Sequence, residues 1–244
     1  MTGDYLLSRA NDFRNYIDAI KTAIDPAFPW YPYHSLQNFT QLQGIFNVRP
    51  LNSLVKDRSR LLDLGAADGD VAYFLETLGY EVEIIDFGPT NFNGLRGARI
   101  LNRALKSTVT INEIDIDAQF PLLKQRYELI FFLGILYHLK NPFFLLEALS
   151  KVSKYLLLST RIAQFAPDGT AISHLPVGYL LDTQECNNDS TNYWIFSASG
   201  LHRLFRRSGW NVLEYSSVGD VKTSNPRDAD HDERVFVLLE SIAR

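Results

Sequence analysis

The stretch from Arg60 to Asp86, RLLDLGAADGDVAYFLETLGYEVEIID, constrains the fold more than any other part of the chain. It begins with a short apolar run and continues through a turn of small residues, Gly65 to Gly69. A helix-patterned segment to Leu78 follows, and then a second apolar run that ends in an acid. This order predicts a strand, a tight loop, a helix and a parallel strand, the first unit of a doubly wound sheet. Such a unit binds a nucleoside cofactor at the carboxyl ends of its strands.

The loop residues discriminate between two classes of cofactor. A dinucleotide fingerprint needs glycine at the first, third and sixth loop positions, so that backbone amides and a helix N-terminus meet a pyrophosphate. Here these positions hold Gly65, Ala67 and Asp70, and Asp63 and Asp68 add acid where two phosphates would lie. S-adenosylmethionine (SAM) has no phosphate, and carboxylates attract its ammonium and sulfonium groups. The loop therefore favours SAM.

Length and composition are compatible with one main domain and a modest elaboration, because 46% of the 244 residues are hydrophobic. The net charge of -4 points to neither a nucleic acid nor a membrane, and it leaves the oligomeric state undefined. Cys186 is the single cysteine, and the first residues lack a secretory pattern, so we expect a cytoplasmic location. Polar residues interrupt the longest apolar region, Leu129 to Leu149, which argues against a membrane span.

Residues 1–55 are expected to form a helical and aromatic cap. Apolar residues recur at helical spacing from Asp4 to Ile24, which predicts an amphipathic helix that Asp25 and Pro26 stop. The prolines in Pro29 to Leu36, PWYPYHSL, exclude a regular helix there. Its aromatic residues form either a packed strap or a substrate lid, and the usual burial of large aromatic side chains favours the strap. A second short helix is expected over Leu36 to Val48.

Residues 56–244 are expected to form the main domain. Alternation over Val109 to Ile116 predicts a third strand, and the apolar runs Tyr127 to Leu133 and Tyr155 to Thr160 predict buried parallel strands. Trp210 to Ser216 and Arg234 to Leu239 are interpreted as an antiparallel closing pair. The fold class is therefore α/β, a doubly wound Rossmann-like sheet of seven strands, mostly parallel with an antiparallel last strand, under an N-terminal helical cap.

Two further segments of the main domain have alternative interpretations. A helix is expected from an N-cap at Thr90 through Leu105, and its basic residues Arg96, Arg99, Arg103 and Lys106 share one face. That face is either a solvated surface, which we favour, or a contact for an anionic ligand or RNA. The irregular insertion around 161–194 is too long for an ordinary connection, so it is either functional or poorly ordered.

Several motifs together resemble a known family. They are DLGAADG at Asp63 to Gly69, the acid Asp86, IDID at Ile114 to Asp117 and FFLGILYHLKNP at Phe131 to Pro142. In this order they resemble the class I SAM-dependent methyltransferases over most of Arg60 to Leu239. The LYH block, together with NYWIFSASGLHRLFRRSGW at Asn192 to Trp210, is similar to the branch of the wobble-uridine tRNA methyl and carboxymethyl transferases and their relatives. Ala67 departs from the usual middle glycine of the loop.

The resemblance implies SAM as cofactor and S-adenosyl-L-homocysteine (SAH) as product. Backbone at Gly65, Ala67 and Gly69 would lie against the methionyl part, and Asp63 would supply charge for its ammonium. Asp86 would accept both ribose hydroxyls, with a helix-capping acid as the alternative. The full set expected to bind the cofactor is Asp63, Gly65, Ala67, Gly69, Asp86, Phe87, Asp115, Ile116 and Leu133.

The expected catalytic residues are Tyr137 and His138, which follow the fourth strand. His138 is either a general base or a residue that hydrogen-bonds the loop and orients Tyr137. The other histidines have no partners at metal-ligand spacing, so we expect no metal site. Ordinary lid packing is the alternative for the residues expected to line an acceptor pocket, which are Tyr33, His34, Arg161, Asn192, Tyr193 and Trp194.

These observations favour an enzyme that transfers a methyl group from SAM to oxygen or nitrogen of a small-molecule acceptor. Methylation of a modified uridine in tRNA is an alternative, which the acidic balance and the lack of an RNA-binding appendage disfavour. A SAM-binding protein without catalysis and a nicotinamide-dependent oxidoreductase are two further alternatives. The irregular segments at Pro29 to Leu36 and Arg161 to Trp194 are where the acceptor would be recognised.

Overall fold

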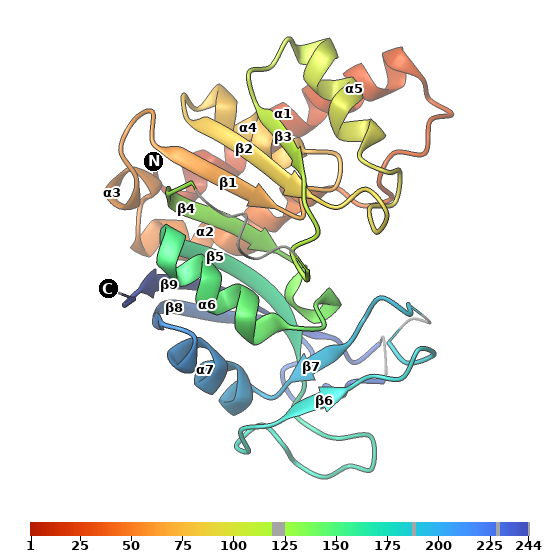
Figure 1. Cartoon of the computed structure of the whole chain (residues 1–244), viewed down its shortest axis with the longest axis vertical. Helices are drawn as coiled ribbons and strands as arrows, with labels where there is room; N and C mark the ends of the chain where they lie inside the picture. Colours follow the sequence, from red (N-terminus) through yellow and green to blue (C-terminus); the bar gives the residue numbers. More distant parts are fainter. Residues whose placement is uncertain (119–124, 187–188, 228–229, 244) are drawn as a thin grey trace. The chain divides into compact units, whose positions relative to one another are not determined.

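The computed structural model describes residues 1–118, 125–186, 189–227 and 230–243 (Figure 1). The chain packs as two compact units. The first contains the described residues 1–118 and 126–131, and the second contains residue 125 and the described residues from 132 onward. Residue 55 lies inside the first unit. The division into a cap and a main domain stays a prediction.

The first unit begins with the helices expected of the cap. Helix α1 spans Gly3–Ile24 and ends at Asp25, as the sequence predicts. A 3-10 turn, η1 (Ser35–Gln37), precedes α2 (Asn38–Val48), which confirms the second helix. A short helix that was not predicted, α3 (Leu51–Leu54), follows Pro50, a residue that is well suited to a helix start.

The strands of the first unit are parallel neighbours. Strand β1 (Arg60–Leu64) lies between β2 (Glu81–Asp86) and β4 (Tyr127–Leu133), and β2 pairs with β3 (Thr110–Glu113) on its other side (Figure 1). Helix α4 (Asp70–Thr77) connects β1 to β2. Strand β4 leaves the first unit after Phe131. Parallel pairing brings the carboxyl ends of β1, β2 and β3 to one edge, where a cofactor site forms in such sheets.

Helix α1 is part of the core of the first unit. Its side chains Leu6, Ala10 and Ile17 are buried. The ring of Phe74 on α4 lies 5.9 Å from that of Phe13 on α1 and 5.0 Å from that of Phe39 on α2. Burial of large aromatic side chains is among the strongest contributions to stability, so α1 is held firmly on the domain.

The helix expected from Thr90 begins later than predicted. Helix α5 spans Arg96–Leu105 and follows Leu95, a residue in a left-handed conformation. The amide side chains of Asn91 and Asn93 explain the delay. Asn91 Oδ1 accepts from the amides of Asn93 and Leu95, and Asn93 Oδ1 accepts from the amide of Gly97. Asparagine side chains that bond the nearby backbone favour a turn over a helix.

The second unit contains the remaining elements. Helix α6 (Pro142–Val152) starts at the expected proline, and α7 (Ala198–Arg207) follows the N-cap Ser197. Strand β5 (Ser153–Ile162) pairs antiparallel with β9 (Glu233–Ser241), which pairs antiparallel with β8 (Trp210–Gly219). The closing antiparallel pair is thus confirmed.

The irregular insertion around 161–194 contains regular structure that was not predicted. Strands β6 (Gly178–Leu180) and β7 (Trp194–Phe196) pair antiparallel, and Phe196 of β7 pairs with the end of β5. Residues 187 and 188 of this segment lie outside the described part of the chain. Strands of only three residues carry too few alternating positions for their pattern to be visible in the sequence.

The fold is the α/β Rossmann-like class that the sequence predicts. Seven of the strands in the described residues are four residues or longer, and they correspond to the seven expected ones. Their pairings are parallel in the first unit, and the last strand of the second is antiparallel. In the part of the chain that the structure describes, no helix combines the length and the apolar character that crossing a membrane would require.

Candidate cofactor site and acceptor site

The loop after β1 turns through three left-handed residues, Gly65, Ala67 and Gly69, whose φ angles are 76°, 56° and 85°. The Gly65 amide donates to the carbonyl of Ile85 at 2.8 Å, which fastens the loop to the end of β2. A Cβ atom on Gly69 would lie 2.9 Å from the side chain of Ile84, so the close approach requires glycine. Ala67 replaces the middle glycine and still adopts the left-handed conformation, at an energetic cost to the backbone.

Asp86, at the end of β2, is bonded to this loop. Its Oδ2 accepts from the Ala67 amide at 3.2 Å and from the Asn91 side chain at 3.0 Å, and its Oδ1 accepts from the Phe87 amide at 2.7 Å. Burial raises the pKa of Asp86 above its ordinary value, against the opposite effect of these donors. The carboxylate is therefore held in one orientation at the sheet edge.

Asp63 lies on β1 with only 5% of its surface exposed. Its Oδ2 accepts a hydrogen bond from the Ala72 amide in the first turn of α4, at 3.1 Å. Burial, with smaller contributions from Asp86 and Asp70, raises the pKa of Asp63 to about 8. A buried carboxylate of this kind is stabilised by an added positive charge.

Phe87, Asp115 and Ile116 complete the predicted residues of this edge in the first unit, and all three are half-buried. The Ile114 amide donates to the carbonyl of Asp86 at 3.0 Å, so the segment after β3 follows the end of β2. Asp115 Oδ1 accepts from the Asp117 amide at 3.0 Å. The structure thus brings the first-unit residues of the predicted cofactor set to one sheet edge, while Leu133, half-buried at the end of β4, belongs to the second unit.

In the second unit, Gly134 turns the chain after β4 with a φ of 76°, and the 3-10 turn η3 (Leu136–His138) follows. His138 Nδ1 lies 2.9 Å from the hydroxyl of Thr191 and 3.2 Å from its carbonyl oxygen. The same hydroxyl donates to Asp189 at 2.6 Å. Burial lowers the pKa of His138, with Thr191 and Asp189 acting in the opposite direction. His138 is therefore a neutral imidazole at pH 7.

The Tyr137 ring contacts both His138 and an arginine. The Tyr137 ring centroid is 4.4 Å from that of His138, and the guanidinium of Arg234, a residue of β9, lies 5.7 Å from the Tyr137 ring centroid. Arg234 Nη1 donates to the Tyr137 hydroxyl at 3.4 Å, while its Nε pairs with Asp232 at 2.9 Å. Tyr137 also packs against a buried apolar cluster that includes Ile195.

The predicted acceptor residues of the second unit gather around the same turn. The Tyr193 amide donates to the Tyr137 carbonyl at 2.7 Å, and the Asn192 side chain donates to the Cys186 carbonyl at 3.1 Å. Trp194 Nε1 donates to the Lys140 carbonyl at 3.3 Å. Arg161 is 2% exposed and forms an ion pair with Asp232 at 2.5 Å.

The other two predicted acceptor residues, Tyr33 and His34, belong to the first unit. Tyr33 is 58% exposed, and its ring meets that of Tyr31 edge to face at 5.4 Å. His34 Nδ1 lies 3.5 Å from Asp18 on α1.

Sequence reasoning missed several residues that the structure places at these sites. Thr191 bonds to the His138 side chain, Asp189 accepts from the Thr191 hydroxyl, and Asp232 joins Arg161 to Arg234. These residues lie in two polar, irregular segments of the sequence, and polar character alone does not predict which side chains bond to each other. In the described residues, no group of three or more His, Cys, Asp or Glu side chains is arranged to hold a metal ion.

A left-handed loop after the first strand and an acid at the end of the second define a nucleoside-cofactor-binding domain of the Rossmann-like class. The sequence matches a family described as a methyltransferase domain over residues 37–215, and the chain belongs to this family. The protein is a SAM-dependent methyltransferase. No curated protein matches the chain.

Solved structures support the fold. The N-terminal domain of EvdMO1 with SAH bound is similar to this chain with a TM-score of 0.60 and 18% identity, covering 94% of this chain and 97% of that domain. The same domain in the presence of SAH and D-fucose gives a TM-score of 0.59 and 17% identity, and the match covers 93% of this chain and 97% of that domain. The [4+2]-cyclase SpnF gives a TM-score of 0.60 and 12% identity, and the match covers 88% of this chain and 87% of SpnF.

Proposed function

We propose that this methyltransferase transfers the methyl group of SAM to an oxygen or nitrogen atom of a small molecule, with His138 as the general base. The observation that carries the proposal is the arrangement of His138, Thr191 and Asp189. The hydroxyl of Thr191 donates its hydrogen bond to Asp189. It has no second hydrogen to donate, so it accepts a hydrogen bond from His138 Nδ1. The carbonyl of Thr191, which is only an acceptor, faces the same nitrogen.

This arrangement selects one tautomer of His138. Nδ1 carries the proton, and Nε2 keeps its lone pair. The lowered pKa keeps the ring neutral near pH 7, so Nε2 is able to accept a proton from a hydroxyl or amine. Methyl transfer is a direct displacement that depends mainly on alignment and desolvation, and a base contributes where the nucleophile carries a proton.

In the proposed cofactor site, the backbone at Gly65, Ala67 and Gly69 contacts the methionyl part of SAM. Asp63 balances the ammonium group and Asp86 accepts the ribose hydroxyls. Asp115 and the backbone of Ile116 meet the adenine amino edge, and Phe87 or Ile116 packs against the ring. Leu133, which belongs to the second unit, stays a prediction. Support comes from the shared sheet edge of the first-unit residues and from the pKa of Asp63, because a cation would stabilise its buried carboxylate.

We propose an acceptor pocket in the second unit from the predicted residues Arg161, Asn192, Tyr193 and Trp194, next to Tyr137. Tyr33 and His34, which belong to the first unit, stay predictions. Aromatic side chains suit a sugar or an aromatic ring, because they offer flat apolar surface and an edge that binds polar groups. A domain of similar fold was crystallised in the presence of D-fucose and SAH, which is compatible with a sugar-like acceptor.

The alternative acceptor is a modified uridine in tRNA, as the resemblance to the wobble-uridine enzymes suggests. The basic face of α5 would be its contact. Two of the four residues already have partners, because Arg99 pairs with Glu113 at 2.8 Å and Arg96 donates to the Asn93 carbonyl at 2.9 Å. With a net charge of -4 as well, the chain favours a small molecule over RNA.

Labelled SAM tests the proposal directly. We expect transfer to at least one member of a panel of sugars, phenols and amines, and none to bulk tRNA at low salt. Transfer to tRNA would replace the small-molecule proposal. SAH binding without methyl transfer to any acceptor would favour a SAM-binding protein without catalysis. A methyl-transfer rate that is unchanged in His138→Asn would show that His138 is not the general base.

A further inference from the structure

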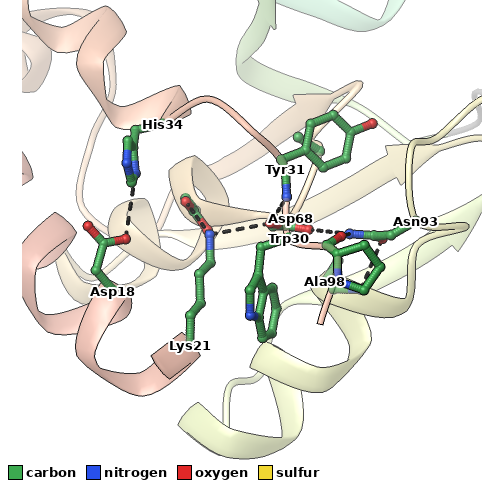
Figure 2. A network of polar contacts seen from close by, with 12 residues as sticks. Asp18, Lys21, Trp30, Tyr31, His34, Asp68, Asn93 and Ala98 are labelled. Atoms are coloured by element: carbon green, nitrogen blue, oxygen red, sulfur yellow. Dashed lines mark hydrogen bonds and ion pairs between the residues drawn. The ribbon is translucent and has the colours of Figure 1, made fainter. Parts of the chain in front are cut away.

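A polar network joins α1, the segment Pro29 to Tyr31 and the loop after β1 (Figure 2). Asp68 is its centre. Its Oδ2 accepts from the Tyr31 amide at 2.9 Å, and its Oδ1 accepts from the Asn93 side chain at 2.7 Å. Asn93 also donates to the carbonyl of Pro29 at 3.2 Å. All these residues belong to the first unit.

Lys21, near the end of α1, supplies the cation of this network. It is 8% exposed, and its Nζ lies 2.9 Å from Asp70 and 3.3 Å from Asp68. Figure 2 shows the lysine side chain extending from α1 toward Asp68. Burial lowers the pKa of Lys21, but the attraction of Asp70 and Asp68 outweighs it and the pKa is raised. Nζ also lies 5.5 Å from the ring centroid of Trp30.

The network continues to the acid at the end of β2. The amide of Asn93 donates to the Asn91 side chain at 3.2 Å. The Asn91 side chain donates in turn to Asp86 at 3.0 Å and to the Ala67 carbonyl at 3.2 Å. An unbroken series of contacts therefore leads from Lys21 through Asp68 and the two asparagines to Asp86.

We propose that Lys21 is a positioning residue for SAM. It holds Asp68 and Asp70 in place and so fixes the loop from Gly65 to Gly69 and the orientation of Asp86. The inference rests on the proposed cofactor role of that loop. Without the lysine, two neighbouring carboxylates would be buried with no cation, and such groups separate, bind water or take up protons.

This inference gives the N-terminal segment a part in cofactor binding. The family match begins at residue 37, so it contains neither Lys21 nor the segment Pro29 to Tyr31. Asp68 holds that segment directly, through the Tyr31 amide, and the Tyr31 hydroxyl accepts from the Phe92 amide at 3.0 Å. A loose loop would therefore release the aromatic segment as well.

The test compares SAH affinity with thermal stability in the full chain. We expect Lys21→Met to raise the SAH dissociation constant at least tenfold in calorimetry. Leu6→Ala is the matched control, because Leu6 is a fully buried residue of α1 that takes no part in the network. It should lower the melting temperature by at least as much and leave the SAH dissociation constant within twofold. Equal losses of affinity in the two variants would overturn the proposal.

A double-mutant cycle tests the route through Asp68. Asp68→Asn should also weaken SAH binding, and Lys21→Met/Asp68→Asn should bind no worse than the weaker single variant. If the loss of SAH affinity in the double variant equals the product of the two single losses, Lys21 acts by a route other than Asp68. If Lys21→Met does not fold, the double variant Lys21→Met/Asp70→Asn takes its place, because it removes one cation and one anion together. We expect its SAH dissociation constant to rise tenfold as well.

Asp86→Ala separates this inference from the cofactor site itself. Normal SAH binding by Asp86→Ala would remove the proposed cofactor role of Asp86. Weak binding by Asp86→Ala together with normal binding by Lys21→Met would overturn the role of Lys21 alone.

Discussion

The carboxylate of Asp63 accepts a hydrogen bond from the backbone amide of Ala72 at 3.1 Å, between a buried strand and the first turn of α4. The first amides of a helix have no partner within the helix, and an acid there also interacts favourably with the helix dipole. Burial nevertheless raises the pKa of this carboxyl to about 8. The ionised form is therefore costly until a cation approaches.

We predict that Asp63→Asn stabilises the protein without cofactor at pH 8 and above. Between the unfolded pKa of about 3.9 and the folded value of about 8, the folded state holds a proton that the unfolded state has lost. The free energy of unfolding therefore falls as the pH rises through this window. The variant lacks this loss, so in urea unfolding it should be more stable than the wild type at pH 8, by up to about 5 kcal/mol for a pKa raised from about 3.9 to about 8, and little different at pH 4.

The control is Glu128→Gln, which removes an exposed carboxylate from β4 and should give the same pH profile as the wild type. SAH binding provides a second measurement. Asp63→Asn should bind SAH more weakly even though it is more stable, because the neutral amide does not balance the ammonium. A stability gain that is equal at pH 4 and pH 8 would contradict the pKa argument.

We predict opposite effects for alanine at two helix glycines. Gly97 is the second residue of α5, and a Cβ atom there would lie 2.0 Å from Asp68 Oδ1 and 2.8 Å from the Asn93 side-chain nitrogen. Gly97→Ala should therefore lower the free energy of unfolding by about 1–3 kcal/mol through overpacking. It should also weaken SAH binding, because it displaces Asp68.

Gly44 in α2 is the matched position, since a Cβ atom there has no neighbour within 4 Å. Gly44→Ala should raise the free energy of unfolding by roughly 0.5–1 kcal/mol, which is the usual gain from replacing glycine in a helix. Thermal unfolding of the two variants with and without SAH gives both results. A stabilising Gly97→Ala variant would mean that Asp68 is free to move.

The sequence predicts those parts of this protein that repeat a local pattern. Apolar periodicity located α1 and the long strands. The residues Gly65 to Asp86 located the sheet edge that we propose binds the cofactor, because strand, turn and helix follow one another there. The partners of Lys21 and Arg161 were not predictable. They are distant in the chain, Lys21 pairing with Asp70 and Arg161 with Asp232, and a charge in the sequence does not indicate which opposite charge it meets.

We predict that Arg161→Met destabilises the second unit strongly. The guanidinium of Arg161 is buried, pairs with Asp232 at 2.5 Å and donates to the Cys186 sulfur at 2.5 Å. The variant loses the contacts of the guanidinium with Asp232 and Cys186, but Asp232 keeps Arg234 as a partner. The cost should therefore be about 1.5–3 kcal/mol, the usual range for lost hydrogen bonds to a charged group. Arg60→Met is the control, because Arg60 and Glu81 are a largely exposed pair at 3.9 Å, and such pairs contribute about 0–1 kcal/mol. Similar urea midpoints for the two variants would show that Arg161 is not needed for stability.

The last prediction concerns the pH dependence of methyl transfer, measured with an acceptor from the panel. Burial lowers the pKa of His138 below its ordinary value of about 6.5. If Nε2 removes the acceptor's proton, kcat/KM should be constant near pH 7 and fall only as the pH drops below 6.5, because kcat/KM reports the base of the free enzyme.

His138→Asn should then reduce kcat by about 10²–10⁴-fold while SAH affinity stays within a few-fold. Thr191→Val offers a finer variant. It removes the hydroxyl that lies 2.9 Å from Nδ1 but keeps the carbonyl that faces the same nitrogen, so the tautomer persists and the rate should fall much less than in His138→Asn. A pH profile that is identical in the wild type and in His138→Asn, at comparable rates, would assign His138 to orienting Tyr137, and the acceptor would then lose its proton to water or to another residue.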